Sequence, residues 1–107
     1  IFVNSKAQKT DGYQLSKALL LNGNTEFDAK PELEIYADDV KCSHGSTSGN
    51  LDEDAIFYLM SRGLNYKQSR KLLINGFLLD VVEKITDLEI KDLIKNIMEN
   101  KEWIYQI

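Results

Sequence analysis

The stretch from Lys30 to Gly63, KPELEIYADDVKCSHGSTSGNLDEDAIFYLMSRG, decides the fold, because a strand pattern changes to a helix pattern within it. On both sides of Asp38-Asp39, apolar and polar residues alternate, as they do in a strand with one buried face. From Asp52 onward, the apolar residues instead follow the spacing of a helix. The sequence therefore predicts an α+β fold in which strands precede helices.

The first half of the chain has the pattern of short strands separated by tight turns, with no helix between them. Turn-forming residues stand at Asp11-Gly12 and at Asn22-Gly23-Asn24. Residues 45–49, GSTSG, are predicted to form a turn that joins the last strand to the helices. This pattern suits a meander, the edge of a sandwich or a parallel β-solenoid, and no repeat period chooses among them.

Helices are predicted in the second half, and three residues that favour the N-cap position begin them: Asp52, Asn65 and Thr86. The second and third of these have a glutamine or glutamate three residues later, which completes a capping box. Gly63 is placed to end the first helix. Gly76, inside the second helix, costs about 1 kcal/mol relative to alanine, so we expect another backbone to approach it closely.

The composition indicates a folded domain and gives no sign of a nucleic-acid-binding or membrane-spanning protein. The chain has 107 residues, of which 43% are hydrophobic, as expected of one folded domain. Its net charge of −4 gives no indication of binding to nucleic acid or to an anionic membrane. Apolar runs are too short for a transmembrane span. A single cysteine cannot form an internal disulfide, which suits a reducing compartment.

Cys42 and His44 are the residues best suited to metal chemistry. If their segment is extended, both side chains leave the same face of one strand, with Cα atoms about 6.5–7 Å apart. A thiolate and an imidazole are both ligands of transition metals. The residues alone also allow a structural reading, in which Cys42 packs as a small hydrophobic group and His44 forms a hydrogen bond beside a turn.

The stretch from Lys30 to Gly63 resembles the C-terminal signature of the SufB/SufD family of iron–sulfur cluster assembly scaffolds. The motif CSHG, at residues 42–45, has the form that is usual on the SufD side of the family. DGYQLSKALLL (Asp11–Leu21) and NGFLLDVV (Asn75–Val82) fit the same pattern, so the resemblance covers about residues 10 to 85. The chain is accordingly expected to be a C-terminal fragment of a SufD-like protein.

The resemblance implies a fold and a site. Residues 1–50 would be the last coils of a right-handed parallel β-helix, and residues 51–107 a C-terminal subdomain of about three helices. His44 corresponds to the SufD histidine implicated in building the nascent cluster at an interface with SufB. Cys42 would be an accessory ligand or a sulfur acceptor.

The resemblance also implies partners. An iron–sulfur cluster usually needs about four protein donors, so a SufB-like subunit would supply the ligands that this chain lacks. The helical region would dock a SufC-like ATPase, with Arg62, Arg70 and Lys71 as polar groups at the rim. The protein would be a non-enzymatic scaffold of the cytoplasm or of a plastid or other organelle stroma, with no cofactor of its own and only a transient iron or cluster. A homodimer through the β-helix is a further expectation.

Two other functions remain open from the sequence. The chain could be a purely structural interaction module, in which Cys42 and His44 only pack. It could also be a thiol enzyme with a Cys–His pair, although two residues on one strand face start too far apart for easy contact and no third residue orients them.

Overall fold

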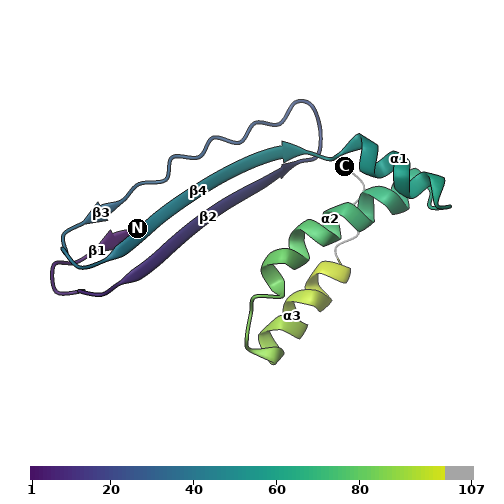
Figure 1. Cartoon of the computed structure of the whole chain (residues 1–107). Helices are drawn as coiled ribbons and strands as arrows, with labels where there is room; N and C mark the ends of the chain where they lie inside the picture. Colours follow the sequence, from purple (N-terminus) through teal and green to yellow (C-terminus); the bar gives the residue numbers. More distant parts are fainter. Residues whose placement is uncertain (101–107) are drawn as a thin grey trace. The chain divides into compact units, whose positions relative to one another are not determined.

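The computed structural model describes residues 1–100, so residues 101–107 of the predicted helical subdomain lie outside the described part. Strands precede helices along the chain, which confirms the α+β class (Figure 1). Within residues 1–100 the elements are β1 (Phe2–Val3), β2 (Asp11–Leu20), β3 (Glu34–Ile35), β4 (Lys41–Asn50), α1 (Glu53–Ser61), α2 (Tyr66–Val82) and α3 (Leu88–Glu99).

The described chain divides into two compact units. The first comprises Ile1–Leu20 and Asn24–Gly49, and so holds the strands. The second comprises Leu21–Gly23 and the chain from Asn50 onward, and holds the helices. Among the described residues, no helix combines the length and the apolar composition that a bilayer span requires.

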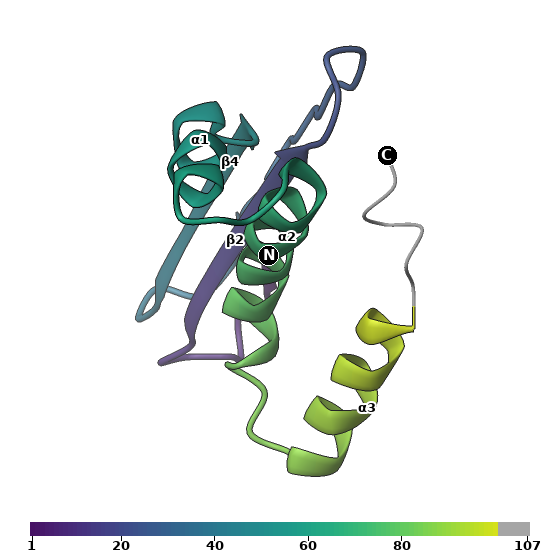
Figure 2. The same ribbon diagram turned by 90° about the vertical axis from the view of Figure 1, so that its right-hand side faces the viewer.

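The strands of the first unit pair across the chain and not with their sequence neighbours. β1 pairs with β3 in parallel, with Phe2 opposite Glu34. β2 lies beside β4, and their arrows point the same way (Figure 1 and Figure 2). A meander would instead pair consecutive strands in antiparallel fashion. The chain therefore makes two successive passes in the same direction, and residues 24–33 return it between them.

The turns at the corner of the two passes are joined by hydrogen bonds. Lys9 N donates to Asp39 O at 2.6 Å, and Lys41 N donates to Thr10 O at 2.9 Å. The paired residues Phe2 and Glu34 are 32 positions apart in the sequence, whereas Lys9 and Asp39 are 30 positions apart. The turn after β1 is therefore two residues longer than the turn after β3. Lys9 accommodates this extra length with a φ of 64°, a left-handed conformation that is uncommon outside glycine.

Two predicted turns are wrong, because both segments belong to long strands. β2 begins at Asp11, and β4 continues through GSTSG to Asn50. A side chain at Gly45 would lie 3.3 Å from Tyr13 Oη and 3.4 Å from Leu15 Cδ1, so side chains of β2 fill the space over this glycine. Pairing with a neighbouring strand thus overrides the turn preference of small residues.

The helices of the second unit begin largely as predicted. Asp52 caps α1 by accepting hydrogen bonds from the backbone N–H groups of Asp54 and Ala55, and Gly63, with a φ of 99°, follows its end. Asn65 and Gln68 form the predicted capping box of α2, with bonds of 2.9 and 2.8 Å. These N-caps satisfy backbone donors that lack partners inside the helix.

Two details of the helix prediction are wrong. The N-cap of α3 is Asp87 and not Thr86, because the Asp87 carboxylate accepts from the backbone N–H groups of Glu89 and Ile90 at 3.0 and 3.1 Å. A carboxylate at this position also favours the positive end of the helix dipole. A Cβ at Gly76 would have no described atom within 4 Å, so no backbone approaches it closely in this part of the chain.

Each unit has its own buried side chains. In the first unit Val3 and Ala37 are buried beside the turns, and in the second the buried apolar residues are Leu51, Ile56, Ile74 and Val82. Ser69 is also fully buried in α2, and its hydroxyl donates to Asn65 O at 3.0 Å. Within the described part, α3 has no buried side chain.

Candidate functional site on strand β4

Strand β4 presents the two candidate metal ligands. The prediction that Cys42 and His44 lie on one strand is confirmed, since both fall within Lys41–Asn50. Two positions apart on a strand, their side chains point to the same side of the sheet. His44 is exposed and Cys42, a free thiol, is half-buried. Strand β4 therefore carries an imidazole and a thiol on the same side, where both could bind one metal ion.

Cys42 packs across the sheet against β2. A Cβ placed on Gly12 would lie 3.7 Å from Cys42 Sγ, so the sulfur lies over the position where Gly12 has no side chain. The same Cβ would lie 3.9 Å from Ile1 Cγ2 and from Thr10 Cγ2. A Cβ at position 12 would therefore be in van der Waals contact with the Cys42 thiol and with both methyl groups.

β4 is also an edge strand in the described part of the chain. It belongs to a two-stranded sheet in which β2 is its neighbour. An edge strand leaves backbone N–H and C=O groups available for pairing with another strand. The element that carries Cys42 and His44 can therefore pair with a strand of a second polypeptide.

The ligand set within residues 1–100 is small. No group of three or more His, Cys, Asp or Glu side chains gathers there as a metal site. Cys42 and His44 supply two donors, while structural metal sites and iron–sulfur clusters usually take about four. The arrangement can supply part of a coordination sphere.

The predicted docking residues lie on α1 and α2 but differ in their surroundings. Arg62 is exposed at the end of α1, with its guanidinium 5.2 Å from the centre of the Tyr58 ring. Arg70 is half-buried, and its Nη2 donates to Leu21 O at 3.5 Å. Lys71 is exposed. Arg70 therefore helps to hold its own unit together, whereas Arg62 and Lys71 face outward.

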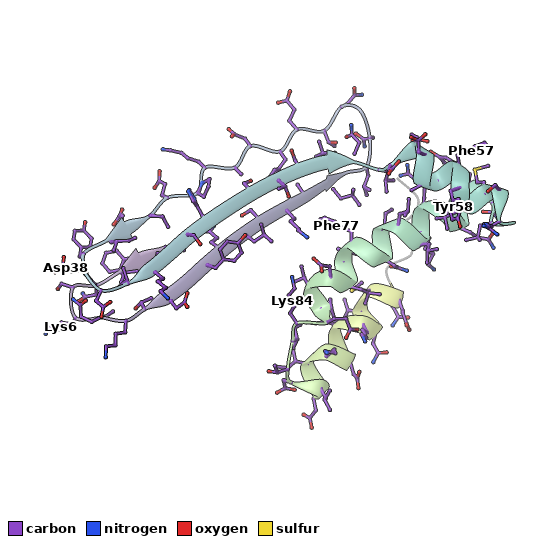
Figure 3. All side chains as sticks on the ribbon, in the orientation of Figure 1. Lys6, Asp38, Phe57, Tyr58, Phe77 and Lys84 are labelled. Atoms are coloured by element: carbon purple, nitrogen blue, oxygen red, sulfur yellow. The ribbon has the colours of Figure 1, made fainter. Side chains whose placement is uncertain are left out.

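Sequence reasoning missed the exposed aromatic residues of α1. Phe57 is 74% exposed and Tyr58 is 56% exposed, and both project from this helix (Figure 3). Their positions, directly after buried Ile56, place them off the apolar face, which is the signal that could have identified them. Large exposed aromatic side chains are typical of protein–protein interfaces.

A charge cluster links α2 to α3. Glu83, which follows α2, accepts from Lys95 Nζ at 2.7 Å and from Lys91 Nζ at 3.3 Å. Hydrogen bonds from Lys95, and then from Lys91, hold the pKa of the Glu83 carboxyl below its usual value. The hydrogen bond to Glu83 raises the pKa of Lys95. Beside the cluster is a cavity of about 220 Å³ lined by Asn75, Leu79, Glu83, Lys95, Met98 and Glu99.

Comparison with known proteins identifies the relatives of the chain. Residues 1–77 match the family model described as "SUF system FeS cluster assembly, SufBD core domain". The iron-sulfur cluster assembly protein SufD of Escherichia coli (strain K12) is 46% identical over 91 residues, which cover 85% of this chain and 22% of that protein. Protein ABCI7, chloroplastic, of Arabidopsis thaliana is 44% identical over 94 residues, which cover 88% of this chain and 20% of that protein.

The similarity extends to a relative with lower sequence identity. The iron-sulfur cluster assembly protein SufD of Bacillus subtilis (strain 168) is 35% identical over 95 residues, covering 89% of this chain and 22% of that protein. The chain therefore spans about a fifth of the length of the curated relatives it matches.

Proposed function

The chain belongs to the SufBD family of the SUF system for iron–sulfur cluster assembly, and from this membership we propose that it is part of a non-catalytic scaffold on which a cluster is built. Iron and sulfide are cargo in this proposal, held transiently by the assembled complex, and no resident cofactor is assigned to this chain.

The observation that carries the proposal is the placement of Cys42 and His44 on one face of β4. Neutral imidazole binds iron ions. A thiolate binds both single iron ions and the iron atoms of an iron–sulfur cluster. His44 is exposed and is proposed as the primary ligand. Cys42 is half-buried and is proposed as an accessory ligand or sulfur acceptor.

We propose that a SufB-like subunit completes the site at the edge of β4. The two donors fall short of a cluster's usual ligand set, and the proposal assigns the remaining ligands to this second polypeptide. The edge of β4 supports this, because a partner strand that pairs there would lie next to His44. A second copy of the chain could use the same edge to form a homodimer.

We further propose that the two strand passes are the last coils of a right-handed parallel β-helix. Parallel pairing of β1 with β3 at an offset of 32 residues, and the stacked turns at Lys9 and Asp39, are what successive solenoid coils require. A rigid stack of coils would fix Cys42 and His44 relative to the partner.

The helical unit is proposed to dock a SufC-like ATPase. Exposed Phe57 and Tyr58 offer apolar area, and Arg62, held over the Tyr58 ring, offers charge at its rim. Lys71 is a second rim group. Arg70 contributes indirectly by anchoring α2 to Leu21.

The proposed location is the bacterial cytoplasm or the stroma of a plastid. The relative from Arabidopsis thaliana is named as chloroplastic, and the other two relatives come from bacteria. A single cysteine, which cannot form an internal disulfide, suits either compartment.

A purely structural interaction module is the second candidate function. It is favoured by the contact geometry of Cys42, whose sulfur packs over Gly12 beside methyl groups of Ile1 and Thr10. In that case β4 would serve only to pair with a partner strand.

Replacement of His44 in the full-length protein distinguishes the two candidates. The protein is co-expressed with SufB-like and SufC-like subunits, and cluster content is read from visible absorption of the purified complex. His44→Ala is expected to lose the cluster while the complex still assembles, as size-exclusion chromatography would show. Ser46→Ala is the matched control, because Ser46 is the next exposed residue on the same face of β4. Equal cluster content in wild type and His44→Ala would support the structural module.

A further inference from the structure

The helical unit carries a basic stretch in a chain that is acidic as a whole. The chain has a net charge of −4, but residues 55–79 contain no acidic residue and four basic ones: Arg62, Lys67, Arg70 and Lys71. This stretch covers most of α1 and α2, which pack against each other. The surface around the connection between these two helices therefore has a charge opposite to that of the whole chain.

The charge of Lys67 is unfavourable to its own helix. Lys67 stands in the first turn of α2, where the positive end of the helix dipole disfavours a cation. Lys71 follows four positions later, so the two like charges also repel each other along one side of the helix. The first turns of α1 and α3 instead contain acidic residues, Glu53, Asp54 and Glu89. A glutamate at position 67 would thus suit the helix better than the lysine does.

We propose that Lys67 extends the ATPase-docking surface of α1 onto α2, and that it meets a part of the ATPase surface that is rich in carboxylates. This inference rests on the proposed function, which assigns the ATPase to this unit, and it adds the chemistry of the partner's surface. Lys67 and Arg62 are both exposed. The Arg62 guanidinium lies 5.2 Å from the centre of the exposed Tyr58 ring, so basic charge adjoins aromatic area. An acidic partner surface complements this combination.

The basic and the aromatic side chains act on different rate constants of docking. Exposed charges attract the partner before contact, so they mainly set the association rate and make it sensitive to salt. Aromatic anchors such as Phe57, once buried by the partner, mainly set the dissociation rate. Lys67 is accordingly expected to speed association and to have little effect on dissociation.

The test measures both rate constants for the full-length protein and the purified SufC-like ATPase by surface plasmon resonance. At an ionic strength of about 0.02 M, Lys67→Glu is expected to slow association about tenfold, and at about 0.3 M by less than about threefold. The thermal midpoint of Lys67→Glu is expected to equal or exceed that of wild type, because glutamate suits the first turn of a helix. A loss of binding through misfolding would have the opposite effect on the midpoint.

Lys6→Glu is the matched control. Lys6 is an exposed lysine of the first unit, so its replacement makes the same change in net charge away from the helices. Its association rate is expected to stay within about twofold of the wild-type rate. Slower, salt-sensitive association in Lys67→Glu, with an unaffected Lys6→Glu and no fall in the thermal midpoint, supports the proposal.

Four results would overturn the inference alone while the ATPase still binds wild type. These are unchanged association in Lys67→Glu, equal slowing in Lys6→Glu, slowing that salt does not reduce, and a lowered thermal midpoint, which would show that Lys67 stabilises its own helix. No binding of the ATPase to wild type at either salt concentration would overturn the docking function, and this inference with it.

Discussion

At the scale of single residues, neighbouring positions on α1 have opposite environments. Ile56 is 2% exposed and Phe57 is 74% exposed, although both are large and apolar. Composition cannot separate them, but helical periodicity can, because it assigns Ile56 to the face that includes Ala55 and Leu59. Ile56 belongs to the core and Phe57 to the surface.

This difference predicts different effects on stability. Ile56→Ala should lower the free energy of unfolding by about 2–4 kcal/mol, because it leaves a cavity in the core. Phe57→Ala is the matched control and should change the free energy by less than about 0.5 kcal/mol. Urea denaturation followed by circular dichroism measures both. Similar losses in the two variants would show that Phe57 is packed.

The same pair tests the proposed docking surface. Phe57→Ala should weaken capture of the SufC-like ATPase by about 1 kcal/mol or more, if Phe57 is an anchor of that interface. Isothermal titration with the purified ATPase measures the dissociation constant. Tyr66→Ala is a suitable control, since Tyr66 is an exposed aromatic residue of α2. Equal affinity of wild type and Phe57→Ala would remove α1 from the interface.

At the scale of elements, the sequence prediction and the structure differ in the N-cap residue of α3. Sequence reasoning selected Thr86 from the spacing of a capping box, but the Asp87 carboxylate makes the bonds. Asp87→Ala should therefore cost about 1 kcal/mol of helix stability, and Thr86→Ala much less. Amide hydrogen exchange of Glu89 and Ile90 measures this. A larger effect of Thr86→Ala would restore the sequence prediction.

Charged side chains contribute to the attachment of α3. α3 has no buried side chain in the described part, and Glu83 accepts hydrogen bonds from both Lys91 and Lys95. Glu83→Gln should therefore speed amide exchange throughout α3, and added salt should reduce the difference from wild type. Lys84→Gln is the control, because the ion pair of Lys84 with Asp80 lies on the α2 side. Unchanged exchange in Glu83→Gln would show that apolar contacts hold α3.

The pKa shifts of Glu83 and Lys95 predict the pH range in which their ion pair stabilises the attachment of α3. Because the pKa of Glu83 is lowered in the folded protein, its stabilisation is complete above the unfolded value of about 4.3 and is lost as the pH falls through the lowered pKa. The pKa of Lys95 is raised, so its stabilisation is complete below about 10.4 and is lost as the pH rises through the raised value. The protection of α3 amides, measured relative to their intrinsic exchange rates, should thus fall at both extremes of pH. Equal pH profiles for wild type and Glu83→Gln would contradict this.

At the scale of the whole molecule, the sequence predicts features that depend on neighbouring residues better than it predicts which distant strands pair. The α+β order, the starts of α1 and α2 and the strand position of Cys42 and His44 depend on nearby residues, and they are confirmed. Strand partners depend on residues about 30 positions away, which periodicity does not register. For this reason the sequence predicts a turn at GSTSG, although this segment is part of strand β4 beside β2.

The candidate site was likewise predictable only in part. Strand spacing places Cys42 and His44 on one face, and the resemblance to a family supplies the iron–sulfur chemistry. The contact of Cys42 with Gly12, and the exposure of Phe57, depend on tertiary packing and needed the structure. The family membership rests on the match of residues 1–77 and on close relatives.

The central claim is that this chain supplies part of a cluster site that a second subunit completes. The most direct measurement is the iron and sulfide content of the full-length protein after reconstitution, alone and together with a SufB-like subunit. A cluster is expected only when both are present, and only with His44 intact. Full occupancy in the protein alone, or equal occupancy in a complex carrying His44→Ala, would contradict the claim.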